Sequence, residues 1–228
     1  MCNLLCVMFA VANLSRPEVA GKRVLEIGSG NVNGSLQPIV KSWDPASYTG
    51  VDIAPGSGVD VVCAAEDIIE KFGKEQFDIV ISTEMLEHVK DWRKVVSNIK
   101  NICMSGGIIL ITTRSLGFEY HGYPNDFWRY EAFDIKSIFS DCIIEKMEAD
   151  KKDPGILFRV KKPAGFKEND LSGYELYSII TGRRVKDISD KELVDFQRRF
   201  ARQERFDGVI NSIRALLRKL MRFIRSML

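Results

Sequence analysis

The sequence is poor in the residues that build metal centres and disulfide frameworks. Its 228 residues include two histidines and five cysteines, and no two cysteines have C-x-x-C spacing. A multi-histidine metal site, a zinc ribbon and a disulfide scaffold are therefore not expected, and no metal is predicted. Single cysteines inside apolar runs are typical of small core residues in a reducing compartment, so the predicted location is the cytoplasm.

Long hydrophobic runs and an excess of charge are also missing. No apolar stretch reaches the ~18–20 residues that a membrane-spanning helix needs. The apolar segment 4–12 lacks the basic residues that begin a signal peptide, so we expect it to form a first helix packed on the core. The formal net charge of +2 is too small to indicate a nucleic-acid partner.

The sequence does have a regular alternation of strand and helix patterns. Strands are predicted at 22–27, 48–53, 59–63, 77–82 and 106–113, and helices at 34–43, 66–73 and 85–104. Strands and helices that alternate in this way predict an α/β fold with a doubly wound, Rossmann-like parallel sheet.

Two later strands differ from the others. Residues 142–148 and 155–162 are separated by too few residues for a helical crossover, so they are predicted to form an antiparallel hairpin at the edge of the sheet. Beyond Pro163 the pattern becomes helical and polar. The core domain is therefore placed at 1–162, and residues 163–228 are predicted to form a helical C-terminal extension.

A glycine-rich turn, within the run VLEIGSGNVNG (24–34), follows the first predicted strand. At the carboxyl end of a parallel strand, Gly28 and Gly30 let a ligand approach the backbone beside a helix N-terminus. Asp52 ends the second strand, where a carboxylate can accept hydrogen bonds from ribose hydroxyls. A nicotinamide-binding fingerprint has a small residue where this chain has Asn33, so a nicotinamide dehydrogenase is the less favoured alternative.

Six short segments carry a resemblance to one family. They are EIGSG (26–30), VDI (51–53), AED (65–67), FD (77–78), MLEHV (85–89) and GG (106–107). Together they resemble the class I S-adenosylmethionine-dependent methyltransferases, in the family's order and over about residues 22–162. The resemblance implies a Rossmann-like methyltransferase fold, S-adenosyl-L-methionine as the cofactor and methyl transfer as the activity. A cofactor-binding partner without catalysis is a further alternative.

The resemblance implies roles for the residues of the glycine turn. Gly28, Ser29 and Gly30 would lie against the methionine moiety of the cofactor. Glu26 would orient this loop and the ammonium group of the ligand.

The resemblance also implies cofactor contacts at the ends of the next strands. Asp52 would hold the ribose, and Ile53 would pack on the adenine ring. Glu66 and Asp67 would contact the adenine amino group, although acidic residues are equally typical of a helix N-terminus. The sulfonium side of the site would be lined by Thr83, Glu84 and Met85.

The residues after the fourth predicted strand limit the acceptor. The run 82–85 (STEM) lacks both the Asn/Asp-Pro-Pro-aromatic turn of methyltransferases that act on exocyclic amines of nucleic acids and the Pro-Cys of the cytosine-C5 type. Glu84 alone is a poor substitute for the carboxylate ligands of metal-dependent, catechol-type enzymes. A small-molecule acceptor is therefore predicted, and a nucleic acid is not.

An aromatic-rich segment, 114–130, leaves the same edge of the predicted sheet. Its part 121–130 resembles a subset of these methyltransferases associated with sugar and polysaccharide modification, which implies a hydroxyl of a sugar or glycan precursor as the acceptor. Aromatic rings beside polar groups suit the mixed faces of a sugar. The residues expected to contact the acceptor are Tyr120, Tyr123, Trp128 and Arg129.

A hydroxyl acceptor needs a base that takes its proton. His121 is the first candidate, because imidazole titrates near neutrality. Asp126 would orient His121 or serve as the base in its place. His88 is expected to pack near the cofactor rather than to act in catalysis.

The charge is unevenly placed along the chain. Residues 196–228 hold nine Lys/Arg and two Asp/Glu, so the rest of the chain is net acidic. From residue 209 onward apolar residues recur at three- and four-residue steps, which predicts an amphipathic helix. Its basic residues include Arg214, Arg218 and Arg222. Such a helix would pack on its own core, form a homodimer contact or lie on an anionic membrane surface.

Overall fold

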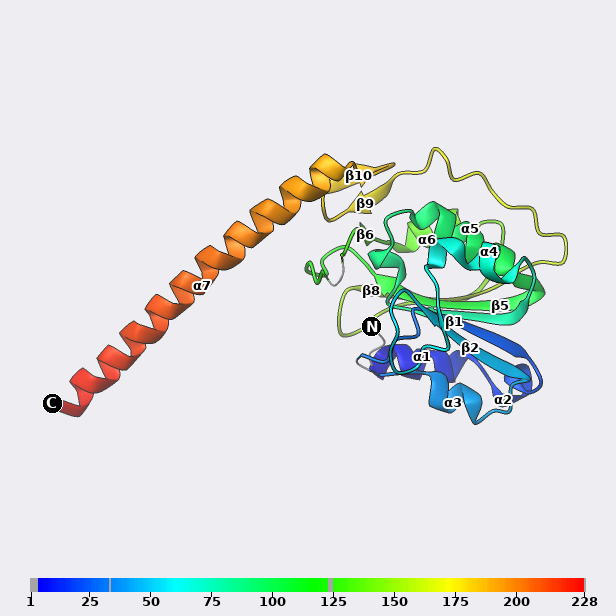
Figure 1. The fold of residues 1–228 in the computed structure, drawn as a ribbon, viewed down its shortest axis with the longest axis horizontal. Coiled ribbons are helices and arrows are strands. Elements are labelled where there is room, and N and C mark those ends of the chain that lie inside the picture. The colour runs from blue at the N-terminus through cyan, green and yellow to red at the C-terminus, as the bar shows by residue number, and fades with distance from the viewer. Residues whose placement is uncertain (1–3, 33, 123–124, 228) are drawn as a thin grey trace. The chain divides into compact units, whose positions relative to one another are not determined.

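The computed structural model describes residues 4–32, 34–122 and 125–227. They form two compact units, of which the first ends at Asp187 and the second begins at Ile188. A seven-stranded sheet forms the centre of the first unit (Figure 1).

The strand order of this sheet is β3-β2-β1-β4-β5-β8-β7. The strands are β1 (Arg23–Ile27), β2 (Ser47–Asp52), β3 (Val61–Val62), β4 (Phe77–Thr83), β5 (Cys103–Arg114), β7 (Ile143–Ala149) and β8 (Gly155–Lys161). Strands β1 to β5 are parallel, and β8 is antiparallel to both of its neighbours. The predicted doubly wound sheet with an antiparallel terminal hairpin is confirmed. Its order reverses between β1 and β4, which is where ligands bind in open α/β sheets.

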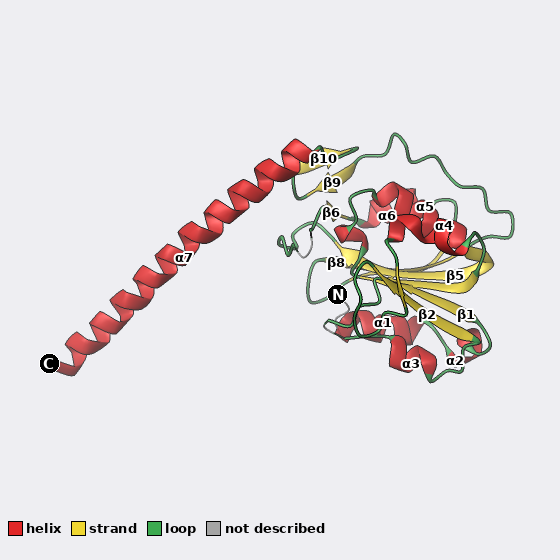
Figure 2. Cartoon of the chain, viewed as in Figure 1, coloured by secondary structure: helices red, strands yellow, loops and turns green. Residues whose placement is uncertain are grey.

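Helices cover both faces of the sheet (Figure 2). One face carries α1 (Leu4–Asn13), α2 (Arg16–Val19) and α3 (Gln37–Lys41), and the other carries α4 (Ile68–Phe72), α5 (Trp92–Ile102) and α6 (Ala132–Ile138). Phe9 and Ala10 of α1 belong to one buried apolar cluster with Val24, Ile79 and Leu110 of the sheet. The central strands β1 and β4 are buried along most of their length because both of their faces are covered.

The predicted helix 85–104 is divided in the structure. Leu86–His88 form a 3-10 turn, η2, and the helix α5 begins only at Trp92. Its N-cap is Asp91, whose side chain accepts a hydrogen bond from the Lys94 N–H at 3.1 Å. The residues between β4 and this cap therefore form a turn at the carboxyl edge of the sheet.

Residues 163–187 are not helical, which corrects the predicted extension. They contribute two strands to a small antiparallel sheet, formed by β6 (Trp128–Arg129), β9 (Leu176–Ser178) and β10 (Arg183–Val185). The Tyr174 hydroxyl and the Arg184 guanidinium also donate to the fully buried carboxylate of Asp134 in α6. Because these contacts attach the segment to the first unit, the boundary between units follows residue 187 rather than residue 162.

The second unit contains one continuous helix, α7 (Asp190–Met227). Ser189 and Glu192 form a capping box at its start: Ser189 Oγ accepts from the Glu192 N–H at 3.2 Å, and the Glu192 carboxylate accepts from the Ser189 N–H at 2.9 Å. Within the part of the chain that the structure describes, no helix combines the length and the apolar character needed to cross a membrane.

Candidate cofactor and acceptor site

The chain turns sharply at the carboxyl end of β1. Gly28 has a φ of 79°, and the N–H groups of Gly28 and Ser29 both donate to the Val51 carbonyl of β2, at 2.8 and 3.1 Å. A Cβ on Gly28 would lie 2.8 Å from the Cβ of Met85, so only glycine fits between this turn and the residue that follows β4. The turn therefore brings the ends of β1, β2 and β4 together, as predicted from the sequence.

Asp52 is held at the end of β2 by the same turn. Its Oδ2 accepts a hydrogen bond from the Gly30 N–H at 2.9 Å. A Cβ on Gly30 would approach that oxygen to 2.9 Å, so the close contact again requires glycine. The half-buried carboxylate keeps lone pairs that can accept hydrogen bonds from a diol. Beside it, 66% of the Ile53 surface is exposed and offers an apolar face to a planar ring.

Glu26 is a buried carboxylate of β1. It is 2% exposed and accepts a hydrogen bond from the Tyr48 hydroxyl of β2. Burial raises the pKa of Glu26 from 4.5 to about 7, the Tyr48 hydrogen bond lowers it, and the nearby Asp52 charge raises it. Glu26 thus exchanges its proton near neutral pH.

The raised pKa of Glu26 makes part of the folding stability depend on pH. Between pH 4.5 and about 7 the folded chain holds a proton on Glu26 that the unfolded chain has lost. The free energy of unfolding is therefore expected to fall as pH rises through this window, by about 3 kcal/mol for this group. Urea denaturation at pH 4.5 and pH 7.5 measures the fall, and Glu26→Gln should reduce it. An equal pH dependence in the variant would contradict the assignment.

Glu66 and Asp67 lie in a 3-10 turn, η1 (Ala65–Asp67), between β3 and α4. Asn98 of α5 fixes this turn, since its Nδ2 donates to the carbonyl oxygens of Ala65 and Glu66 at 3.0 and 2.7 Å. Glu66 is half-buried, whereas Asp67 is exposed and lies 3.5 Å from the ammonium of Lys94. The adenine contact of both residues stays a prediction, and Asp67 also has the ordinary place of an acidic residue at a helix N-terminus.

Strand β4 ends in a strained turn that supports the sulfonium side of the predicted site. Glu84, directly after the buried Thr83, has a φ of 53°, in the left-handed region that residues other than glycine seldom adopt. Its N–H donates to the Thr112 carbonyl of β5 at 2.9 Å. The turn places Met85 against the glycine loop described above.

The Glu84 carboxyl group points to partners inside the core. It is 5% exposed, forms an ion pair with Arg114, and accepts a hydrogen bond from the Thr112 hydroxyl at 3.0 Å. Burial and then the neighbouring Glu87 carboxylate raise its pKa, whereas Arg114 lowers it. The contribution of Glu84 to the predicted site is therefore its backbone turn.

The aromatic-rich loop after β5 is organised around Asp126. This carboxylate is fully buried and forms a two-pronged ion pair with Arg129, at 2.5 and 2.7 Å. Its Oδ2 also accepts from the backbone N–H of His121 at 3.0 Å and lies 2.9 Å from His121 Nδ1. Burial raises the pKa of Asp126, but the hydrogen bonds from Arg129 and His121 have the larger combined effect and hold it well below its usual range. Such a weak base favours the orienting role predicted for Asp126 over proton transfer.

The structure corrects the acceptor contacts predicted for Trp128 and Arg129. Both residues are only 1% exposed, so an acceptor has almost no surface of either to touch. The Trp128 indole N–H donates to the carbonyls of Val89 and Lys90, and Arg129 donates to the carbonyls of the loop residues 118 and 119. The two side chains therefore stabilise the conformation of the loop. Tyr120 is half-buried in it. Tyr123 lies outside the described residues.

The structure brings Glu87 and His88 beside His121. The ring centroids of the two histidines are 4.8 Å apart. The Phe127 N–H donates to the Glu87 carbonyl at 2.8 Å, which ties the aromatic loop to the η2 turn. Sequence reasoning gave Glu87 no role, although its position just after β4 was a signal, because the loops that follow parallel strands meet at one edge of the sheet.

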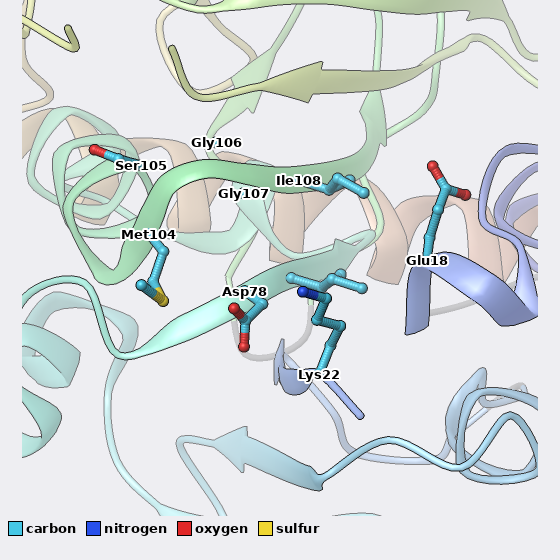
Figure 3. Close-up of a pocket in the computed structure, with 9 residues that line it drawn as sticks. Glu18, Lys22, Asp78, Met104, Ser105, Gly106, Gly107 and Ile108 are labelled. Atoms are coloured by element: carbon cyan, nitrogen blue, oxygen red, sulfur yellow. The ribbon is translucent and has the colours of Figure 1, made fainter. Parts of the chain in front are cut away.

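A small cavity lies at the opposite edge of the sheet, where β4 and β5 begin (Figure 3). Its volume is about 170 Å³, and its lining includes Lys22, Asp78 and Gly107. Sites that enclose a small organic ligand usually have volumes of roughly 300–1,000 Å³. None of the predicted cofactor residues lines this cavity, so it adds nothing to the candidate site.

Comparisons with known sequences identify the family of the chain. Residues 8–141 match a family model described as a methyltransferase domain. The ubiquinone biosynthesis O-methyltransferases of Pseudomonas syringae pv. tomato and Pseudomonas entomophila are each 33% identical to this chain in a 112-residue alignment that covers 43% of this chain and 47% of the relative. The chain thus spans about half the length of the curated relatives it matches.

Solved structures show the same fold. An S-adenosylmethionine-dependent methyltransferase from Mesorhizobium loti superposes with a TM-score of 0.53 at 14% identity, over 66% of this chain and 94% of that one. The 1,6-didemethyltoxoflavin-N1-methyltransferase of Burkholderia thailandensis, solved with 1,6-didemethyltoxoflavin and S-adenosylhomocysteine, gives a TM-score of 0.57 at 12% identity, over 70% and 77%.

The glycine turn and Asp52 at the switch point of the sheet define a nucleoside-binding domain of the Rossmann-like class. The family model spans more than half of the chain, and the chain belongs to the S-adenosylmethionine-dependent methyltransferases of class I. The predicted family and its cofactor are confirmed, and the nicotinamide dehydrogenase is set aside. The predicted assignment to the sugar-type subset rests on the sequence of the aromatic loop alone.

Proposed function

We propose that this chain transfers a methyl group from S-adenosylmethionine to a hydroxyl oxygen of a small polar acceptor. The observation that carries the proposal is the convergence of the glycine turn, Asp52 and the His121 loop at the carboxyl edge of one parallel sheet. Curated relatives named as O-methyltransferases support oxygen as the methylated atom.

The residues of this edge fit the cofactor. Asp52 would accept the ribose hydroxyls, and Ile53 would cover the adenine ring. Glu26 would act through the glycine turn on the ammonium group. The Ser29 hydroxyl is buried in that turn without a hydrogen-bond partner among the described residues, as expected of a group that a ligand completes. When bound, S-adenosylmethionine supplies a methyl group on a positively charged sulfur.

The acceptor we propose is a sugar or glycan precursor. The support is the resemblance of residues 121–130 to sugar-modifying methyltransferases and the half-buried Tyr120 and His121 on the loop. With Trp128 and Arg129 buried, these two residues and the exposed Leu116 remain as candidates to touch the acceptor.

His121 is the group that the site offers for removing the acceptor proton. Its side chain is 24% exposed, so a hydroxyl can reach it, and its Nδ1 lies 2.9 Å from the Asp126 carboxylate, which also accepts the His121 backbone N–H. Bond formation between the acceptor oxygen and the methyl carbon would be balanced by breaking of the carbon–sulfur bond, with S-adenosylhomocysteine as the leaving group. The acceptor proton passes to the imidazole and then to solvent. Positioning of the oxygen ~3–3.5 Å from the methyl carbon, in line with the sulfur, supplies much of the rate.

Asp52→Ala tests the cofactor site. The variant is expected to bind S-adenosylhomocysteine roughly ten- to a hundred-fold more weakly, because it loses charge-assisted hydrogen bonds that contribute about 1.5–3 kcal/mol. Isothermal titration calorimetry measures the affinity, and Glu70→Ala, at an exposed carboxylate of α4, is the matched control that keeps it.

Two results would reject the proposed function. One is tight binding of NAD with no response to S-adenosylhomocysteine. The other is cofactor binding without turnover on any hydroxyl acceptor in a metabolite screen, because that outcome indicates a cofactor-binding partner without catalysis.

We also propose that α7 associates with an anionic membrane surface. The support is one continuous helix over 190–227 together with basic residues at four-residue intervals in its sequence, since each Lys or Arg near an anionic surface contributes about 1 kcal/mol. The full chain is expected to bind anionic vesicles at low salt, and truncation after Asp207 is expected to abolish binding while cofactor affinity is kept. Vesicle sedimentation tests this. If truncation instead halves the mass in solution, the helix is a homodimer contact.

A further inference from the structure

Glu87, His88 and His121 form a cluster with the composition of a metal site. One potential donor atom of each residue lies within 4.8 Å of those of the other two. Glu87 is fully buried: its Oε2 accepts a hydrogen bond from the Thr113 hydroxyl at 2.9 Å, and its Oε1 has no hydrogen-bond partner among the described residues. A buried carboxylate oxygen without a partner is costly, which points to a ligand that completes it.

Each imidazole of the cluster has one buried nitrogen without a hydrogen-bond partner among the described residues. His88 Nδ1 is bonded to the Asn125 carbonyl, so it carries the proton, and the buried Nε2 has no partner among the residues that the structure describes. His121 Nδ1 lies 2.9 Å from the Asp126 carboxylate and is likewise buried without a hydrogen-bond partner among the described residues. Histidines that bind metals usually have such a carbonyl or carboxylate behind them.

We propose that Glu87, His88 and His121 bind one divalent transition-metal ion of the Zn²⁺ type. Two imidazole nitrogens and a carboxylate oxygen suit Zn²⁺, Mn²⁺, Fe²⁺ or Co²⁺. They disfavour Mg²⁺ and Ca²⁺, which prefer oxygen ligands alone. Donor atoms that share a zinc ion at about 2.1 Å lie ~3.4 Å apart in a tetrahedron. The three side chains must therefore close slightly around the ion, and the partly exposed His121 ring has space to turn.

This site was not predicted from the sequence. Two histidines and the absence of cysteine pairs predicted no metal, and Glu84 was the only carboxylate considered as a ligand. The strained turn at Glu84 directs that carboxyl group into the core. The following η2 turn then carries the adjacent Glu87 and His88 to the sheet edge, where the aromatic loop brings His121.

A role for the ion rests on the proposed function. Three protein ligands leave coordination positions open for oxygen atoms of the acceptor, and a vicinal pair of hydroxyls would occupy two of them. A bound ion would lower the pKa of a coordinated hydroxyl, so that the hydroxyl proton would pass to solvent as the oxygen attacks the methyl carbon. His121 is then a ligand in place of a base, while the bonds formed and broken at the methyl carbon are unchanged. This form of the site selects acceptors with two neighbouring oxygens.

Metal binding can be measured without any assay of activity. The full chain is stripped with EDTA and titrated with Zn²⁺ by calorimetry, and its histidine ring signals are followed by NMR with ¹³C,¹⁵N-histidine labelling. The chain contains two histidines, and both are in the cluster, so one equivalent of Zn²⁺ is expected to shift both sets of ring signals. Co²⁺ in place of Zn²⁺ should give visible absorption bands of a cation bound by nitrogen and oxygen.

Glu87→Gln is the decisive variant, because it preserves the side-chain volume and an oxygen for the Thr113 hydroxyl. It is expected to weaken Zn²⁺ binding by about 100-fold or more, beyond the roughly 10–100-fold loss typical of an outer-sphere partner. Glu119→Gln, at an exposed carboxylate of the same loop, is the matched control and should bind Zn²⁺ as the parent does. The histidine spectrum of stripped Glu87→Gln shows whether the variant has kept its fold.

Two results would overturn the proposal: Zn²⁺ that shifts fewer than both histidines, or equal Zn²⁺ affinity in the parent and in folded Glu87→Gln. Each is separable from failure of the proposed function. A stripped chain that methylates a hydroxyl at the full rate and ignores Zn²⁺ keeps the function and loses the metal site. A chain that binds one Zn²⁺ through both histidines but does not bind S-adenosylhomocysteine keeps the metal site and loses the function.

Discussion

His121→Ala is expected to lower turnover by about 10²–10⁴-fold, the scale of a lost general base. The loss follows because His121 is the partly exposed imidazole on the aromatic loop, held by Asp126 at the edge where the cofactor residues converge. Affinity for S-adenosylhomocysteine should be unchanged, since the hydrogen bonds and ring contacts of His121 in the described structure are with residues other than the glycine turn and Asp52. Initial rates at saturating cofactor, together with calorimetry, separate the two effects.

The matched control for this experiment is Glu119→Gln, which removes a charge from the same loop without touching the cluster. Its turnover should equal that of the parent. Full activity in His121→Ala would show that the acceptor loses its proton without this side chain. If the loss occurs and added Zn²⁺ does not raise the turnover of the metal-stripped parent, the imidazole acts as a base. If turnover of the parent depends on added Zn²⁺, the imidazole acts as a ligand.

The sheet and the cofactor residues could be predicted because both follow from patterns of neighbouring residues in the sequence. The consecutive apolar residues within 22–27 and 77–82 need burial on two faces, which a covered parallel sheet provides. Gly28 and Asp52 follow the ends of such strands, so placing the strands also places the residues that follow them. The hairpin of β7 and β8 was predictable for a related reason, because its connection is too short for a helix.

The acceptor side of the site could not be predicted in the same way. The composition of the aromatic loop shows that it has rings and charges, but not which of them face the core. Trp128 and Arg129 turn inward because β6 pairs with β9, a strand of three residues that is too short to show an alternating pattern. The contact of His121 with Glu87 and His88 likewise depends on how two separate loops fold.

Arg129→Met is expected to lower the free energy of unfolding by about 3–5 kcal/mol, the range measured when one partner of a buried ion pair is removed. The volume of the side chain is nearly kept, so the main loss is electrostatic: the fully buried Asp126 carboxylate keeps its charge and loses the guanidinium that neutralises it. Urea denaturation followed by circular dichroism measures the change. Arg16→Met, at an ion pair with both side chains about two-thirds exposed, is the control and should cost no more than about 1 kcal/mol.

A second substitution tests the cause of this loss. Asp126→Asn removes the buried charge and keeps an oxygen that can accept the His121 N–H, so Arg129→Met combined with Asp126→Asn should be more stable than Arg129→Met alone. A double variant that is no more stable than the single one would mean that Arg129 acts through its hydrogen bonds to the loop carbonyls, not through its charge. Turnover should remain low in the double variant even where stability returns, because a neutral amide beside His121 Nδ1 stabilises a protonated imidazole less than a carboxylate does. Low turnover at restored stability would therefore show that the Asp126 carboxylate acts on His121 itself and does not merely keep the loop folded.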